Sequence, residues 1–135
     1  MTQPRGIRNH NPGNIRWGAD WQGLKKGGKL QDPSFCVFVN PSFGIRALAK
    51  VLINYKKLHS LKTVRSIISR YAPPNENQTL AYIKSVANQL SVHPDDVIDI
   101  EEHGVLTVFI KAVIRYENGV QPYSNEIIQQ GIDLI

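Results

Sequence analysis

Glu117 is the residue whose type and position best suit acid–base chemistry. Four residues of the segment VLTVFIKAVIRYENG fall on one otherwise apolar face of a helix: Leu106, Ile110, Val113 and Glu117. Partial desolvation and the negative end of the helix dipole both predict a raised pKa for this carboxyl group. A carboxyl that keeps its proton near neutral pH can act as a general acid. An ion pair with a buried arginine, or rotation into solvent at a fraying helix end, would explain the same pattern without catalysis.

Other kinds of chemistry find little support in the residue inventory. The four histidines show no metal-ligand spacing, and a single cysteine, Cys36, excludes an intramolecular disulfide and a cysteine-rich metal site. The alternating segment FCVFV predicts that Cys36 is a small buried residue rather than a nucleophile. Neither G-x-S-x-G nor a P-loop occurs. We therefore expect no metal and no cofactor.

The chain carries an excess of positive charge. Its 135 residues include 16 Lys and Arg against 11 Asp and Glu, which gives a formal net charge of +5. This balance suits an anionic polymer: nucleic acid, an acidic membrane surface, or peptidoglycan with its peptide carboxylates. No apolar run reaches the roughly 20 residues of a membrane span. Residues 1–9 lack the apolar stretch of a signal peptide.

The chain changes character near residue 41. Residues 1–41 hold many of the glycines and prolines, and they predict loops with a small β-lobe. Its strands are expected over 35–39 and around 15–21. Residues 42–135 have the apolar spacing of helices. We therefore expect one domain of mainly α class, with about five helices around one buried helix.

Local signals predict where several of these helices begin and end. Thr63 is a suitable N-cap for a helix that stops before Ala72, because prolines follow. Leu80 is expected on the apolar side of the next helix, together with Ile83. Gly119 should end the helix that carries Glu117.

Four segments carry a resemblance to a known family. They are RGIRNHNPGNIRWGADWQG (5–23), FCVFVNPSFGIRAL (35–48), YAPPNENQTLAYIKSVANQL (71–90) and AVIRYENGVQPYSNEIIQQG (112–131). Together they resemble the lysozyme-like peptidoglycan hydrolases, above all the flagellar-type glucosaminidases. The chain is also similar to a small group of phage virion and prophage proteins that share RGIRN-x-NPGNIR and ENG-x-QPYS. The resemblance implies an α+β lysozyme-like domain over 1–135 that cleaves the glycan strand of the bacterial cell wall.

The order of these segments differs from that of the glucosaminidases, in which a helix ending in the catalytic Glu comes first. Here the corresponding helix–Glu–loop–Ser–helix segment, 112–131, comes last. Read cyclically, 105–135 followed by 1–90 restores the order of the family, so we expect a circular permutation. Such a rearrangement is tolerated where the two ends of the chain lie close together. The resemblance then makes Glu117 the catalytic acid.

The resemblance also implies a groove for sugar rings. Amides and aromatic rings that suit such a groove are Asn11, Asn14, Trp17, Trp21, Tyr71, Tyr82 and Tyr123. Core packing is the alternative role for both tryptophans and for Tyr82. A plain turn is the alternative for the segment 11–14.

A second carboxylate decides the type of reaction. Asp32 lies where the related glucosaminidases place a mobile acid, and Glu76 lies in the YAPPNEN segment. If either stands about 6.5–9.5 Å from Glu117, hydrolysis with inversion becomes possible. If neither does, a lytic transglycosylase is favoured, in which one Glu serves as acid and then as base. The alternatives are an Asp-Pro turn for Asp32 and a backbone-bound loop residue for Glu76.

Two other classes of function compete with the enzyme. One is a non-catalytic peptidoglycan-binding or virion structural protein that keeps the groove. The other is a single-strand nucleic-acid module, suggested by basic residues near two tryptophans, although no nucleic-acid-binding motif is present. The resemblance implies a protein of the phage virion or the host cytoplasm that acts on the wall in the periplasm. Its expected partners are peptidoglycan strands and other phage particle proteins, without a specific nucleic acid.

Overall fold

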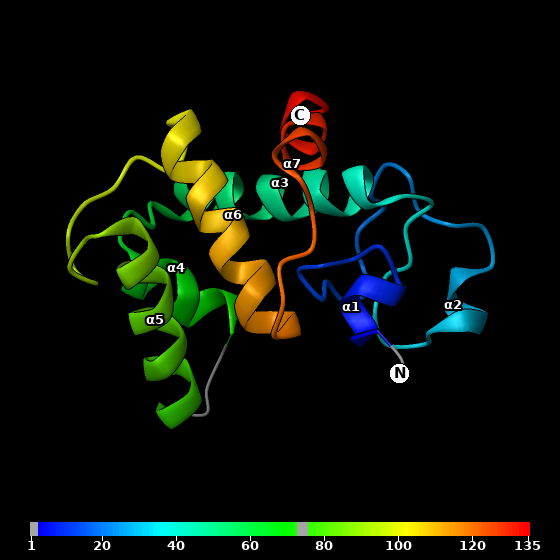
Figure 1. Cartoon of the computed structure of the whole chain (residues 1–135), viewed down its shortest axis with the longest axis horizontal. Coiled ribbons are helices and arrows are strands. Elements are labelled where there is room, and N and C mark those ends of the chain that lie inside the picture. Colours follow the sequence, from blue (N-terminus) through cyan, green and yellow to red (C-terminus); the bar gives the residue numbers. More distant parts are fainter. Residues whose placement is uncertain (1–2, 73–75) are drawn as a thin grey trace.

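The computed structural model describes residues 3–72 and 76–135, apart from the side chains of residues 76 and 77. In this part of the chain it contains seven helices (Figure 1): α1 (Arg5–Arg8), α2 (Gly28–Gln31), α3 (Pro41–His59), α4 (Val64–Tyr71), α5 (Glu76–Leu90), α6 (His103–Asn118) and α7 (Asn125–Asp133). Five of them have eight or more residues, as expected, and α1 and α2 are single turns within the predicted loops. The mainly α class is confirmed.

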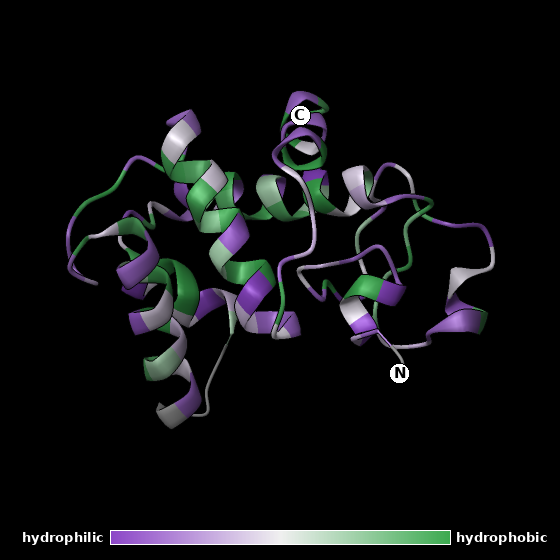
Figure 2. Cartoon of the chain, viewed as in Figure 1, coloured by the Kyte–Doolittle hydropathy of each residue, from purple (hydrophilic) through white to green (hydrophobic). Residues whose placement is uncertain are grey.

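The main core lies where α3 to α7 meet. α6 contacts α1, α3 and α5, and α7 packs along α3. The side chains of Leu106, Phe109 and Ile110 on α6 are buried, whereas Arg115 on its other side is exposed. Figure 2 shows hydrophobic residues along the facing sides of α4 and α6, while α2 is largely hydrophilic. The expected central helix is thus α6, which is buried on one side only.

The predicted strand pair in the N-terminal part is reduced to isolated bridges. Residues 35–39 pair through two isolated bridges, Arg16 with Phe35 and Leu24 with Phe38, rather than through a ladder. The reason is that the segment divides its backbone hydrogen bonds among three neighbours: the N–H groups of Cys36, Phe38 and Val39 donate to the carbonyls of Ile15, Asn9 and Gly23, each at 2.9 Å. The lobe is therefore held by a small second core instead of a sheet.

This second core surrounds Cys36, Phe38 and Ala47. Trp17 and Trp21 pack against it, as do Ile15, Leu24 and Phe43. Ala47 belongs to α3, so the N-terminal lobe is attached directly to the longest helix.

The predicted helix ends are confirmed at the positions that matter for the site. Thr63 caps α4 through a reciprocal capping box with Ser66. Ser124 accepts a hydrogen bond from Ile127 at the start of α7. Gly119 adopts φ 75° and ends α6. Glu117 therefore lies in the last turn of α6.

The expected apolar side of α5 is confirmed at Ile83, Val86 and Ala87, which are buried, but not at Leu80. Leu80, placed on that side by its spacing, is 46% exposed, whereas Tyr82 and Ile83 are each 2% exposed. Tyr82 stacks on Tyr116 of α6 with ring centroids 3.9 Å apart. The contact with α6 thus selects Tyr82 instead of Leu80.

The last helix does not lead back toward residues 9–14. In Figure 1, α7 and α1 lie on opposite sides of α3. The expected closeness of the two ends is therefore not observed, and the circular permutation stays a prediction. No helix within 3–72 or 76–135 has both the length and the apolar character to cross a membrane.

Candidate active site

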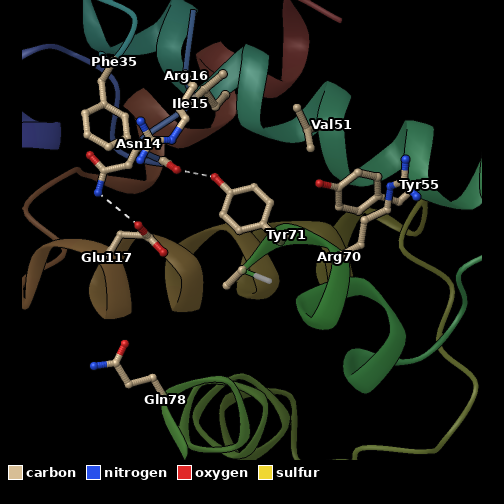
Figure 3. A pocket seen from close by; sticks show the side chains of 12 residues that line it. Asn14, Ile15, Arg16, Phe35, Val51, Tyr55, Arg70, Tyr71, Gln78 and Glu117 are labelled. Carbon is tan, nitrogen blue, oxygen red and sulfur yellow. Dashed lines mark hydrogen bonds between the residues drawn. The ribbon is translucent and has the colours of Figure 1, made fainter. Parts of the chain in front are cut away.

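A groove of about 730 Å³ opens between the N-terminal lobe and the helices. Figure 3 shows the side chains that line it. They come from the loop after α1, from α3, α4 and α5, and from the end of α6: Gly13, Asn14, Ile15, Arg16, Phe35, Val51, Tyr55, Arg70, Tyr71, Ala72, Gln78 and Glu117. Three of the residues expected from the sequence, Asn14, Tyr71 and Glu117, meet here.

Glu117 is half-buried and faces this groove (Figure 3). Among the described side chains that line the groove, it is the one carboxylate. The side-chain amide of Asn14 donates to its Oε1 atom at 3.0 Å. This hydrogen bond orients the Glu117 carboxylate in the groove, and lone pairs remain on it to exchange a proton with a bound molecule.

Asn14 adopts a backbone conformation that most residues avoid. Its φ of 53° lies in the left-handed region, which asparagine tolerates better than other side chains do. This conformation occurs directly where the side chain meets Glu117. Uncommon backbone geometry often marks functional sites, because the surrounding structure must hold it in place.

The loop that carries Asn14 is tied to the helices on either side of the groove. The Pro12 carbonyl accepts a hydrogen bond from the Asn118 amide at 2.8 Å. The Gly13 carbonyl accepts one from the Tyr71 hydroxyl. A Cβ atom on Gly13 would lie 2.5 Å from that hydroxyl oxygen, so the contact requires glycine. α4 and α6 thus fix the position of the loop.

Two tyrosines experience the charge of Glu117. Burial raises the pKa of Tyr71 well above its usual value, and the nearby carboxylate of Glu117 raises it further. Burial and then Glu117 also raise the pKa of Tyr82 strongly. Tyr82 is in the main core rather than in the groove lining, so the packing alternative describes its position. Both phenols are therefore neutral groups beside a carboxylate.

Two arginines give the groove positive charge. The guanidinium carbon of Arg16 lies 4.6 Å from the centre of the Phe35 ring, and that of Arg70 lies 5.5 Å from the centre of the Tyr55 ring. All four residues line the groove. The sequence did not indicate Arg70, Phe35 or Tyr55 as groove residues, because the two members of each stacked pair are far apart in the chain and no local motif predicts their contact.

Besides Tyr82, four more of the predicted groove residues lie outside the groove lining. Asn11 is fully buried, and its amide group binds the backbone of Ile15 and Cys36. Trp17 donates to the Asp32 carbonyl at 2.7 Å and, like Trp21, packs against the second core. Tyr123 packs against the main core, and burial raises its pKa to about 12. None of these four side chains lines the groove.

Asp32 is likewise absent from the groove lining. Its carboxylate is 5% exposed and takes two hydrogen bonds from Arg5, at 2.6 and 2.7 Å. Asn9 and the backbone N–H groups of Ser34 and Phe35 donate three more. The Arg5 hydrogen bonds hold the pKa of Asp32 well below its usual range. Asp32 is thus a fixed structural anion rather than a mobile acid.

The other candidate second acid cannot be placed. Glu76 is the first residue of α5, but its side chain lies outside the described residues. Among the side chains that are described, no cluster of three or more His, Cys, Asp or Glu could hold a metal ion.

Comparison with known proteins shows the family of the chain. It is 37% identical over 133 residues to Protein P5 of Pseudoalteromonas phage PM2, a match that covers 96% of this chain and 80% of that protein. The chain therefore belongs to the same family as Protein P5. No model of a known protein family matches it.

Proposed function

We propose that this member of the Protein P5 family cleaves the glycan strand of bacterial peptidoglycan, with Glu117 as its general acid and base. The observation that carries the proposal is the placement of Glu117 in a large groove, oriented by the Asn14 amide. Groups that suit sugar hydroxyls surround it, among them the amide of Gln78 and the phenol of Tyr71. The resemblance of segment 112–131 to the helix–Glu–loop–Ser–helix segment of the flagellar-type glucosaminidases supports the same role.

A single acid favours cleavage without water. Glu117 would donate its proton to the glycosidic oxygen, so that the bond from that oxygen to C1 of the muramyl sugar breaks and the leaving sugar gains a hydroxyl group. The Glu117 carboxylate would then take the proton of the 6-hydroxyl group of the same muramyl sugar. The 6-oxygen bonds to C1, which leaves a 1,6-anhydro end and restores the acid. This route needs no second carboxylate. It is therefore compatible with the ion pair that holds Asp32 to Arg5.

Mass spectrometry of digested cell walls tests the proposal. Purified walls are incubated with the wild-type protein and with Glu117→Gln, and the ends of the glycan products are identified. We expect 1,6-anhydro ends from the wild type alone. Reducing ends would indicate hydrolysis and direct attention to Glu76. Binding to walls without any new ends would favour a non-catalytic wall-binding or virion structural protein.

We also propose that the protein reaches the wall in a phage context. The support is the family relationship to a phage protein. It would be carried on the particle or made in the infected cell, and it would act in the periplasm. Its presence in purified particles, measured by mass spectrometry, distinguishes these two routes.

A further inference from the structure

Two aromatic–guanidinium pairs stand at separate places along the groove. In Figure 3, Phe35 and Arg16 lie at the end near Asn14 and Glu117, whereas Tyr55 and Arg70 lie at the far end. Tyr71 lies between the two pairs in this view. The groove therefore presents a cation on each side of its centre.

Stacking on an aromatic ring orients each guanidinium group for binding a planar anion. A ring face restrains the plane of the group while its N–H donors stay available at the edge. That geometry matches the two oxygens of a carboxylate. Neither Arg16 nor Arg70 forms an ion pair with a described carboxylate. By contrast, Arg5, on the same Phe35 ring, is bound to Asp32.

We propose that Arg16 and Arg70 bind carboxylates that hang from the glycan strand, so that the groove selects charged wall glycan over uncharged chitin-type glycan. The inference rests on the proposed function and adds a substrate preference to it. In peptidoglycan such carboxylates come from the peptide stems or, where these are removed, from the lactyl groups. Both sources present the same planar anion to a guanidinium group.

The spacing of charges favours this ligand over a nucleic acid. A phosphate backbone brings a negative charge with every residue, and some of these charges would lie beside Glu117, the carboxylate of the groove. Carboxylates on alternate sugars can meet the two arginines: the muramyl sugar at Glu117 can place its carboxylate at Arg16, and the next muramyl sugar can reach Arg70. A neutral sugar then lies between them, beside Tyr71. Hydroxyl and amide contacts from Tyr71 and Gln78 suit that neutral sugar.

The variants must separate specific contacts from net charge. Residues 1–41 contain six of the 16 Lys and Arg residues but only two of the 11 Asp and Glu residues. Because this excess of positive charge attracts the anionic wall, loss of any cation could weaken wall binding. The test variant is the double change Arg16→Gln and Arg70→Gln. Its matched control is Lys62→Gln with Lys84→Gln, which removes two exposed cations that do not line the groove. All proteins also carry Glu117→Gln, so that binding is measured without cleavage.

Binding is measured by sedimentation with four insoluble glycans: native walls, walls whose carboxylates have been converted to neutral amides, walls stripped of peptides, and chitin. We expect native walls to bind about tenfold or more tightly than amidated walls or chitin. The double arginine variant should lose this preference, and the lysine control should keep it. Stripped walls that bind like native walls would assign the contact to lactyl groups, and weaker binding would assign it to peptide stems.

Three results would overturn the proposal. They are equal binding of native and amidated walls, the same loss in the lysine control as in the arginine variant, and tighter binding of a single-stranded oligonucleotide than of native walls. Because the assay reads binding alone, its outcome is independent of whether the wild-type protein cleaves the strand. Failure of the proposed function would appear instead as missing glycan ends in the digest.

Discussion

Asn14 and Glu117 are 103 positions apart in the sequence, yet the amide of one donates to the carboxylate of the other at 3.0 Å. The contact joins the N-terminal lobe to the last turn of α6 and spans one edge of the groove. It orients the carboxylate that the proposed chemistry uses.

Replacing Glu117 with glutamine should abolish cleavage and leave the fold intact. Gln keeps the shape of the side chain and can still accept the Asn14 hydrogen bond, but it has no proton to give to the glycosidic oxygen. General acid–base catalysis contributes about 10²–10⁴-fold to a rate, and a loss of this size is expected in the release of anhydro products. Circular dichroism melting checks the fold. Glu126→Gln, an exposed acid on α7, serves as the control that keeps activity.

Replacing Asn14 with glycine should slow cleavage by about 10–100-fold, as expected for loss of a hydrogen bond to a charged group. Glycine accepts the φ of 53° without strain, so the melting temperature should stay close to that of the wild type. Alanine would add backbone strain and mix the two effects. A large fall in melting temperature together with a normal rate, corrected for folded protein, would assign Asn14 a purely structural role.

Gly6 is expected to be essential for the geometry of the same pair. A Cβ atom there would lie 2.5 Å from Asn118 Oδ1 and 2.7 Å from Asn14 Oδ1. Gly6→Ala should therefore displace both amides and reduce the cleavage rate as well as the stability. Gly104→Ala makes the same chemical change at the other end of α6, where the nearest atom is a flexible Glu102 oxygen at 3.3 Å. That control should retain wild-type cleavage, and an active Gly6→Ala protein would argue against this support.

Parts of the structure that depend on local sequence could be predicted. The cap at Thr63, the end of α6 at Gly119 and the placement of Glu117 in its last turn all follow from residues within a few positions of one another. Helix capping and apolar periodicity act over this short range. The groove contacts of Glu117 do not, because Asn14 and Tyr71 reach it through the tertiary fold.

The errors have the same cause. Asp32 resembled a mobile acid until the structure showed its partner, Arg5, 27 positions earlier. The segment 35–39 has the alternation of a strand, but it binds three different segments instead of one partner. For Trp17, the sequence could not choose between a groove and a core, because the answer depends on which side chains surround the ring.

Asp32 should matter for stability at low pH rather than for catalysis. Its pKa is held well below the unfolded value of about 3.9, mainly by Arg5. The stability that this carboxylate contributes is therefore fully present above about pH 4, and it is lost as the pH falls toward the folded pKa. Asp32→Asn should lower the free energy of unfolding at pH 7 by about 1–3 kcal/mol. In this variant the free energy of unfolding should also decrease less steeply as the pH falls below about 4.

Denaturant titrations at several pH values measure this effect, with Asp20→Asn as an exposed control. Cleavage by Asp32→Asn, assayed well below its melting temperature, should persist. If that variant is fully stable but inactive, Asp32 is a catalytic acid and the single-acid route is wrong.

The buried tyrosines should limit stability at high pH. The pKa values of Tyr71 and Tyr82 are raised by burial and by Glu117, and burial raises the pKa of Tyr123 to about 12. An unfolded tyrosine ionises near pH 10, so above about pH 10 the folded state holds more protons than the unfolded state does. Stability is therefore unaffected by these groups below about pH 10, and it should fall as the pH rises toward their folded values.

Tyr82→Phe tests one contribution to this alkaline loss. The Tyr82 hydroxyl finds no hydrogen-bond partner among the described residues, so its removal should leave stability at pH 7 unchanged or slightly higher. The slope of unfolding free energy against pH should become shallower above about pH 10, because one fewer buried proton must be retained. Glu117→Gln should shift the same curve in the same direction, since it removes the charge that opposes ionisation of both phenols. Denaturant titrations combined with phenolate absorbance give both quantities. A slope that is identical in wild type, Tyr82→Phe and Glu117→Gln would show that these tyrosines ionise as exposed groups do, and the placement of Glu117 beside them would be wrong.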